Sequence, residues 1–290
     1  MYNFLQKLKN SGHTCTLLGI GPVSKSVIKA TFEAGLKYSF PPVFIASRNQ
    51  VDLESLGHGY LMGGMDQFDF VSTLKKIQND VGYEGPLYIC RDHGGPWQRN
   101  MELDNKYSLE KAMEIAAAYN IGFKEHNGDY LGAADCSIHP EIGVTGVNVA
   151  PELGLVGTDA YLFLADLENQ AAEQSLLTTG ESSGLKNLLI EKTFKSSPWR
   201  KWLTHDLKEL PAAEVEGNGS LRQLIARVCG HYVYDDPQVA TARDQLFKNS
   251  RRFNLVENPE HFVIEKLLRA IGFYVKHFRM EGINRIAGRD

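Results

Sequence analysis

Two ionisable residues, Asp92 and His93, follow a short apolar run, Leu87 to Cys90. The run has the length of a strand, and turn-forming residues flank it, Gly85-Pro86 before and Gly94-Gly95-Pro96 after. A carboxylate beside an imidazole can transfer a proton and bind a metal ion. The alternative is structural: Asp92 would be a helix N-cap and His93 a surface residue.

Polar residues also follow the other apolar runs in the first half of the chain. The runs at 14–20, 42–47, 122–127 and 144–152 are expected to be strands, and helical spacing occurs between several of them. This alternation predicts a parallel sheet whose carboxyl ends form one rim. The residues expected at that rim are Arg48, Asn49, Gln50, Arg91, Asp92, His93, Lys124, Glu125, His126, Asp129, His139, Asn148 and Glu152.

Imidazoles and carboxylates in such a set are typical ligands of a divalent metal, while amides and guanidinium groups suit hydroxyls, carboxylates or phosphates. Each residue also has a simpler interpretation. Glu125 and His126 alternate along one strand, so only one of them can face the interior. His139 precedes a proline and can end a turn. Glu152 can be a helix N-terminal carboxylate, and the two amides after the second strand can bind loop backbone.

The composition is that of an ordinary soluble protein: 290 residues, 43% of them hydrophobic and 23% charged. The net charge of -4 argues against a nucleic-acid surface, and no apolar run is long enough to cross a bilayer. The N-terminus lacks the pattern of a signal peptide. The four cysteines are scattered, without a Cys-x-x-Cys pair. A cytoplasmic protein without nucleic-acid or membrane partners is expected.

The second half of the chain is expected to be mostly helical. Thr158 or Asp159 can cap a helix that runs to about Gln174, and 178–184 has the composition of a loop or lid. Further helices are expected at 185–194, 219–229, 237–248 and 261–280. We expect one domain over residues 1–290, with a helical part over 185–290 packed on it.

Several ordered motifs resemble the tagatose-1,6-bisphosphate aldolase non-catalytic subunit (GatZ/KbaZ-like) family. They are Pro42–Val51, which ends in Asn-Gln-Val, Arg91–Gln98 with its Asp-His-x-Gly-Pro pattern, and Phe123–His126 with Asp129 after it. Val149–Gly154 and Tyr232–Val239 resemble later segments of the family. The resemblance is good over about residues 12–130. The chain is shorter than the family norm and lacks material between positions 129 and 143.

The resemblance implies a TIM-type (β/α) barrel, possibly shortened and related to class II ketose-bisphosphate aldolases. It implies a metal-dependent enzyme that acts on a ketose or ketose phosphate by retro-aldol cleavage or C4 epimerisation. Catalytic roles would fall to Asp92 and Glu125. A divalent metal, zinc above all, would bind His93, His126, His139 and Glu152. The substrate would contact Arg48, Asn49, Gln50, Arg91, Lys124 and Asn148. A homo-oligomer is also expected.

Two other functions compete with this one. The family name points to a non-catalytic accessory subunit that stabilises a class II tagatose-bisphosphate aldolase, its partner being the catalytic subunit. A sugar-phosphate kinase is the third possibility, but the sequence has no Gly-x-x-x-x-Gly-Lys-Ser/Thr phosphate loop and no kinase-type Gly-rich turn.

Overall fold

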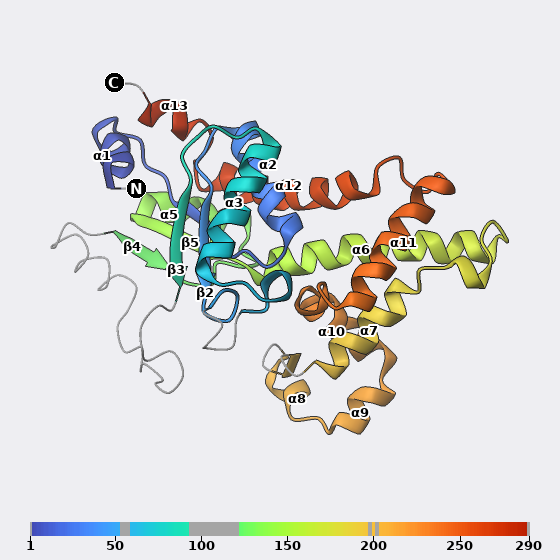
Figure 1. The fold of residues 1–290 in the computed structure, drawn as a ribbon. Helices are drawn as coiled ribbons and strands as arrows, with labels where there is room; N and C mark the ends of the chain where they lie inside the picture. Colours follow the sequence, from blue (N-terminus) through green and yellow to red (C-terminus); the bar gives the residue numbers. More distant parts are fainter. Residues whose placement is uncertain (1, 53–58, 93–121, 197–198, 201–202, 289–290) are drawn as a thin grey trace.

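A curled, parallel five-stranded sheet lies at the centre of the first half of the chain (Figure 1). The computed structural model describes residues 2–52, 59–92, 122–196, 199–200 and 203–288. The strands are β1 (Leu17–Ile20), β2 (Val43–Ser47), β3 (Tyr88–Asp92), β4 (Phe123–Glu125) and β5 (Val144–Val149). Their order is β3-β2-β1-β5-β4, and every neighbouring pair is parallel. The predicted α/β class is confirmed, while the described residues form a half-barrel and not the complete TIM barrel expected.

Helices cover the outer face of this sheet. α2 (Lys25–Tyr38) begins after Ser24, whose hydroxyl accepts a hydrogen bond from the backbone N–H of Val27 at 3.2 Å. α3 (Gln67–Val81) begins after Asp66, which caps it in the same way, and packs on α2. α12 (Pro259–His277) returns from the C-terminal half to lie beside α2.

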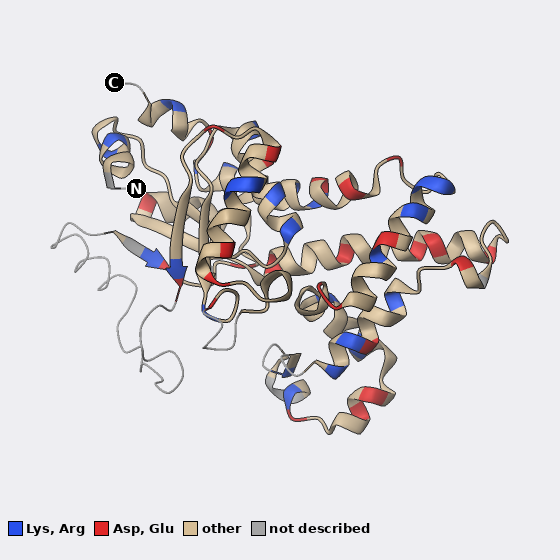
Figure 2. Cartoon of the chain, in the orientation of Figure 1, with Lys and Arg blue, Asp and Glu red and all other residues tan. Residues whose placement is uncertain are grey.

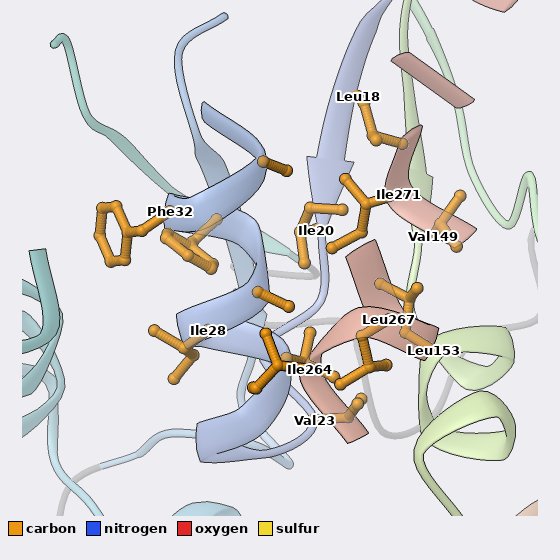
Figure 3. Close-up of a cluster of buried hydrophobic side chains, with 14 of the residues drawn as sticks. Leu18, Ile20, Val23, Ile28, Phe32, Val149, Leu153, Ile264, Leu267 and Ile271 are labelled. Carbon is orange, nitrogen blue, oxygen red and sulfur yellow. The ribbon is translucent and has the colours of Figure 1, made fainter. Parts of the chain in front are cut away.

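The main hydrophobic core lies between the sheet and these helices (Figure 3). Leu18 and Ile20 of β1 face Ile271 and Leu267 of α12. Phe32 of α2 lies against β2, the strand next to β1. All of these side chains are at most 1% exposed. Each one removed from water contributes roughly 1.5–3 kcal/mol. The core therefore joins the first strand to a helix almost 250 residues later in the chain.

Two helices in the middle of the chain differ from expectation. His139, which could have ended a turn, lies within α5 (Ala133–Ile142). α6 (Pro151–Glu173) begins well before Thr158 or Asp159, the predicted caps. The physical reason is a cap from elsewhere: the Asp129 carboxylate accepts hydrogen bonds from the backbone N–H groups of Ala150 and Glu152, both at 2.9 Å.

The C-terminal half is helical as predicted. It contains α7 (Leu185–Lys195), α8 (His205–Lys208), α9 (Ala212–Gly217), α10 (Gly219–Cys229), the single turn η5 (Gly230–Val233) and α11 (Pro237–Arg252). α7, α10 and α11 pack against α6, which extends away from the sheet (Figure 1). Figure 2 shows acidic and basic residues interspersed along these helices. The remaining short elements are α1 (Tyr2–Asn10), η2 (Leu61–Gly63), η3 (Thr179–Glu181) and α13 (Ile283–Ala287).

The loop at 178–184, a predicted lid candidate, lies at the end of α6 remote from the sheet (Figure 1). It is bound to Glu168, which is only 1% exposed and accepts hydrogen bonds from the backbone and hydroxyl of Ser183 and from the Asn249 amide. The loop is thus attached to the helical part and far from the strand ends. None of the described helices combines the length and apolar character needed to cross a membrane.

Candidate functional site

A cavity of about 310 Å³ lies at the carboxyl ends of the strands, and we call it the rim cavity. Its volume is at the lower end of the range of small-molecule sites. Strand register explains part of its lining, because Ser47 of β2 is paired with Asp92 of β3. The polar residues that line the cavity are Ser47, Asn49, Gln50, Asp92, His126, Asn127 and Asn148.

Asp92 lies at the centre of the ionisable groups of this rim. Its Oδ2 lies 3.1 Å from Nε2 of His126, and its Oδ1 lies 3.3 Å from Nζ of Lys124. Lys124 and His126 are two residues apart and therefore project from the same face of the chain. Asp92 ends β3 and Lys124 belongs to β4, the two edge strands of the sheet. The sheet is thus curled so strongly that side chains from its two edges meet.

The structure separates Glu125 and His139 from this group. Glu125 projects from the opposite face of β4, where its Oε2 lies 2.6 Å from Nε2 of His139 on α5. The other ring nitrogen of His139 lies 2.6 Å from the backbone oxygen of Asp135, and the side chain is 8% exposed. This pair links β4 to α5. Neither residue lines the rim cavity.

Glu152 is also engaged outside the cavity lining. Its Oε2 accepts hydrogen bonds from the backbone N–H of Tyr130 at 2.6 Å and from the Tyr274 hydroxyl. Burial, together with the neighbouring Glu152 carboxylate, raises the pKa of Tyr274. Glu152 therefore joins the start of α6 to α12.

Arg48 and Arg91, both predicted to hold substrate, converge instead on Asp52. Arg48 Nε lies 2.9 Å from one Asp52 oxygen and Arg91 Nη2 lies 3.4 Å from the other. Arg91 also donates to the backbone oxygen of Val51 at 2.7 Å. Asp52 is 5% exposed, and the two guanidinium groups compensate its buried charge. His93, the remaining predicted metal ligand, lies outside the described residues.

The amides of the rim are brought together as predicted at the strand ends. Gln50 and Asn148 are each 6% exposed, and Asn49 lines the same cavity. Gln50 Oε1 accepts a hydrogen bond from the backbone N–H of Ser47 at 2.8 Å, which fixes its orientation. Asn148 Oδ1 is buried and has no hydrogen-bond partner within the described chain. A buried oxygen without a partner in a cavity wall is suited to a donor group of a ligand.

The lining residues that were not predicted from the sequence include Tyr60, Asn127, His231 and Tyr232. Two of them belong to η5 in the helical part, which no strand-end argument could reach. The sequence carried one signal, since Tyr232 opens the Tyr-rich segment that resembles the aldolase-subunit family. Burial lowers the pKa of His231 to about 4. Its imidazole is therefore neutral near pH 7.

Asp129, which caps α6, lies two residues after Asn127, which lines the rim cavity. Burial raises the pKa of its carboxyl group to about 6, against two backbone N–H groups that favour the ionised form. Its Oδ2 is buried without a hydrogen-bond partner in the described structure. The charge of His126 also acts on Asp129, which places the two groups within electrostatic range of each other.

A metal site is not completed by the residues that the structure describes. Among them no three His, Cys, Asp or Glu side chains are grouped in a way that could hold a metal ion. Asp92 and His126 supply one oxygen and one nitrogen, whereas a catalytic zinc takes three protein ligands. We therefore derive no chemical step through a metal.

Comparisons with known proteins show the fold. No family model and no curated protein matches the sequence. Among solved structures, the chain is similar to the crystal structure of a probable tagatose 6 phosphate kinase from Sinorhizobium meliloti 1021. The TM-score is 0.65 and the identity 13%, over 90% of this chain and 100% of that one. Because the identity is so low, the likeness establishes a shared fold, and membership of the aldolase-subunit family stays a prediction.

Proposed function

We propose that this protein is a carbohydrate enzyme that binds a ketose or ketose phosphate in the rim cavity and uses Asp92 and His126 to move a proton. The observation that carries the proposal is the contact of a carboxylate and an imidazole within a cavity whose lining also includes several amides. Amides donate and accept hydrogen bonds, as several sugar hydroxyls require. The solved structure of similar fold is named for tagatose 6-phosphate, which supports a sugar phosphate as ligand.

The proposed chemistry begins with removal of the hydroxyl proton at C4 of the ketose. Asp92 accepts this proton, and His126 at 3.1 Å can receive it from the carboxyl group. The C4 oxygen becomes a carbonyl oxygen as the C3–C4 bond breaks, and the bond electrons pass to C3 to form an enediolate. Lys124, 3.3 Å from Asp92, places a positive charge beside these groups. Rotation of the aldehyde and re-addition would give C4 epimerisation, whereas its release would complete cleavage.

Metal dependence is a separate proposal, because the described residues provide only two donors. A divalent ion such as zinc would stabilise the enediolate charge when bound. Elemental analysis of the purified protein, before and after dialysis against a chelator, tests this. A protein without a stoichiometric divalent metal, whose activity does not respond to added Zn²⁺, Mn²⁺ or Mg²⁺, would contradict it.

The reaction is tested by incubating the protein with D-tagatose 6-phosphate, D-tagatose 1,6-bisphosphate and unphosphorylated D-tagatose, and following cleavage and C4 inversion by NMR. We expect turnover of at least one, and a fall in kcat of about 10²–10⁴-fold in Asp92→Asn and His126→Gln. Asp80→Asn, an exposed carboxylate paired with Lys76 on α3, is the matched control. Equal activity of Asp92→Asn and the control would refute the assignment.

The accessory-subunit function remains the second candidate, and one observation favours it. Several predicted site groups, Arg48, Arg91, Glu125 and His139, are engaged in internal ion pairs instead of lining the cavity. This function predicts a stable complex with a class II aldolase and no loss of complex activity in Asp92→Asn. Co-purification from the native host followed by assay of the complex distinguishes the two. A kinase would consume a nucleoside triphosphate. The same NMR assay detects this when a nucleoside triphosphate is added.

A further inference from the structure

One wall of the rim cavity is aromatic, and two of its three residues come from the helical part. It consists of Tyr60, His231 and Tyr232, which we call the aromatic wall. The Tyr60 and Tyr232 rings meet edge to face, with centroids 4.7 Å apart and planes at 67°. The His231 and Tyr232 rings are 4.2 Å apart at 36°. Edge-to-face pairs at this separation are favourable arrangements of aromatic rings.

Tyr60 is fixed to the rim of the sheet. Its backbone N–H donates to the backbone oxygen of Asn49 at 2.9 Å, and its hydroxyl is hydrogen-bonded to the Gln50 side chain. The preceding residue must be glycine, because a Cβ at Gly59 would lie 1.8 Å from the backbone oxygen of Gln50. This close approach brings the Tyr60 ring over the strand ends, where it touches both the amide rim and the helical part.

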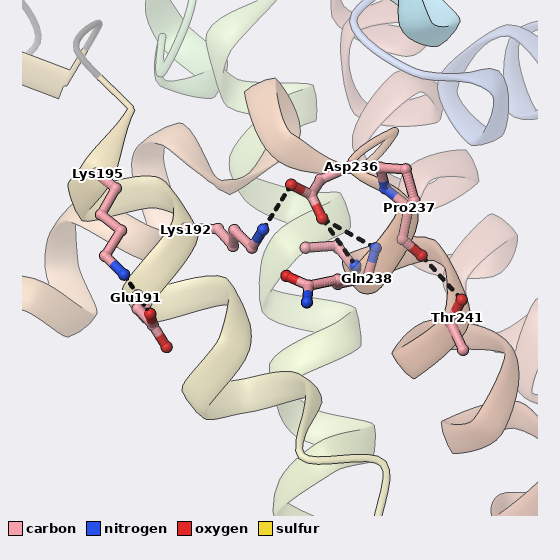
Figure 4. Close-up of polar contacts among 8 residues, drawn as sticks. Glu191, Lys192, Lys195, Asp236, Pro237, Gln238 and Thr241 are labelled. Carbon is pink, nitrogen blue, oxygen red and sulfur yellow. Dashed lines mark hydrogen bonds and ion pairs between the residues drawn. The ribbon is translucent and has the colours of Figure 1, made fainter.

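Tyr232 is fixed from the other side, by the residues that follow it. The Tyr234 hydroxyl lies 2.7 Å from Oγ1 of Thr158 on α6, and its ring is buried. Asp236 then caps α11 by accepting from the backbone N–H of Gln238 at 2.9 Å and forms an ion pair with Lys192 of α7 at 2.8 Å (Figure 4). The segment 230–236 is thus anchored in the helical part, and it presents Tyr232 to the cavity.

The third member of the wall carries no charge near pH 7. His231 is 4% exposed and packs so closely on α6 that a Cβ at Gly154 would lie 2.5 Å from its Nδ1. Of the residues known to line the cavity, none is lysine or arginine. The cavity therefore offers a ligand a neutral aromatic surface on one side and amides with one acid–imidazole pair on another.

We propose that Tyr60 and Tyr232 form a platform against which the C–H face of the bound sugar packs, so that the helical part of the chain selects the substrate. The inference rests on the proposed function of the rim cavity. A sugar has hydroxyl groups along its edges and C–H groups on a face, which matches this division of the lining. Aromatic surface supplies contact area, and the few polar groups fix the orientation of the ligand.

Calorimetric titration with D-tagatose 6-phosphate and with D-tagatose tests the platform. We expect Tyr232→Ala to raise Kd about tenfold or more for each ligand that the wild type binds, because the ring's contact area is lost. Tyr232→Phe, which keeps the ring, should change Kd by less than about threefold. Phe68→Ala on α3, where the side chain is 74% exposed, is the matched aromatic control and should bind as the wild type does.

The outcomes separate this inference from the proposed function. A Tyr232→Ala protein that melts as the wild type does and binds with unchanged Kd overturns the platform, whereas loss of turnover in Asp92→Asn would still support the proposed reaction. If Tyr232→Ala does not fold, Tyr232→Leu keeps an apolar side chain without the ring and is held to the same criterion. A wild type that binds neither ligand and does not turn over D-tagatose 1,6-bisphosphate overturns both proposals.

Discussion

Replacing Gly154 by alanine should destabilise the protein by pushing the aromatic wall away from α6. The new Cβ would lie 2.5 Å from Nδ1 of His231 and 2.9 Å from two ring carbons, about 1 Å inside ordinary contact distance. The ring cannot move aside easily, because it is 4% exposed and packs against the Tyr232 ring. Overpacking of this kind costs about 1–3 kcal/mol. Alanine also gains about 1 kcal/mol in helix propensity, which offsets part of the loss.

Gly157→Ala on the same helix isolates the steric effect. There the nearest atoms to a new Cβ are the Tyr234 hydroxyl at 3.6 Å and a Leu267 methyl at 4.0 Å, both ordinary contacts. The propensity gain is common to both variants, so their free energies of unfolding should differ by about 2 kcal/mol. Thermal denaturation should show Gly154→Ala melting about 4 °C below Gly157→Ala. Equal melting temperatures would refute the packing of His231 on α6.

Three further predictions concern buried charges. Burial holds the pKa of His231 at about 4, against an ordinary value of 6.5. The folded protein therefore keeps its full free energy of unfolding above pH 6.5 and loses part of it as pH falls toward 4, because the unfolded state binds the proton more readily. His231→Gln should therefore lose less stability between pH 7.5 and 5, by about 2 kcal/mol in urea titrations. The pKa of Asp129 is raised to about 6 from 3.8, so its carboxyl destabilises the fold as pH rises through that window. Asp129→Asn, which keeps the capping oxygen, should gain up to about 3 kcal/mol over wild type at pH 8 and little at pH 4. Asp52→Ala leaves two partly buried guanidinium groups unpaired and should cost about 3–5 kcal/mol, against about 0–1 kcal/mol for Asp80→Ala at an exposed pair.

Three of the strands could be predicted from sequence because they are short, mainly apolar runs bounded by turn residues. Leu17–Ile20 is buried throughout, Val43–Ser47 is buried except at its last residue, and four of the six residues of Val144–Val149 are buried, which explains the apolar runs. The start of α6 could not be predicted. The side chain that caps it, Asp129, is more than twenty residues earlier in the chain, so no local pattern marks the true first turn.

The site could be predicted only along the faces that strand periodicity defines. The alternation of Lys124, Glu125 and His126 indicated that one side chain must face away, and the structure shows that it is Glu125, bound to His139. The ion pairs of Arg48 and Arg91 with Asp52 could not be predicted from strand periodicity. It depends on how the chain turns after β2, and Asp52 carries no periodic signal.

The location of the rim cavity follows from the way the sheet ends. A parallel sheet that closes completely satisfies its edge strands through a backbone ladder. Among the described residues, the edge strands β3 and β4 meet through the side chains of Asp92, Lys124 and His126. A carboxylate held between two basic groups at an edge is accessible to a ligand in a way that a backbone ladder is not. Tyr232 of η5 also lines the cavity at these strand ends. The helical part and the acid–imidazole pair therefore border one cavity, at the carboxyl ends of the described strands.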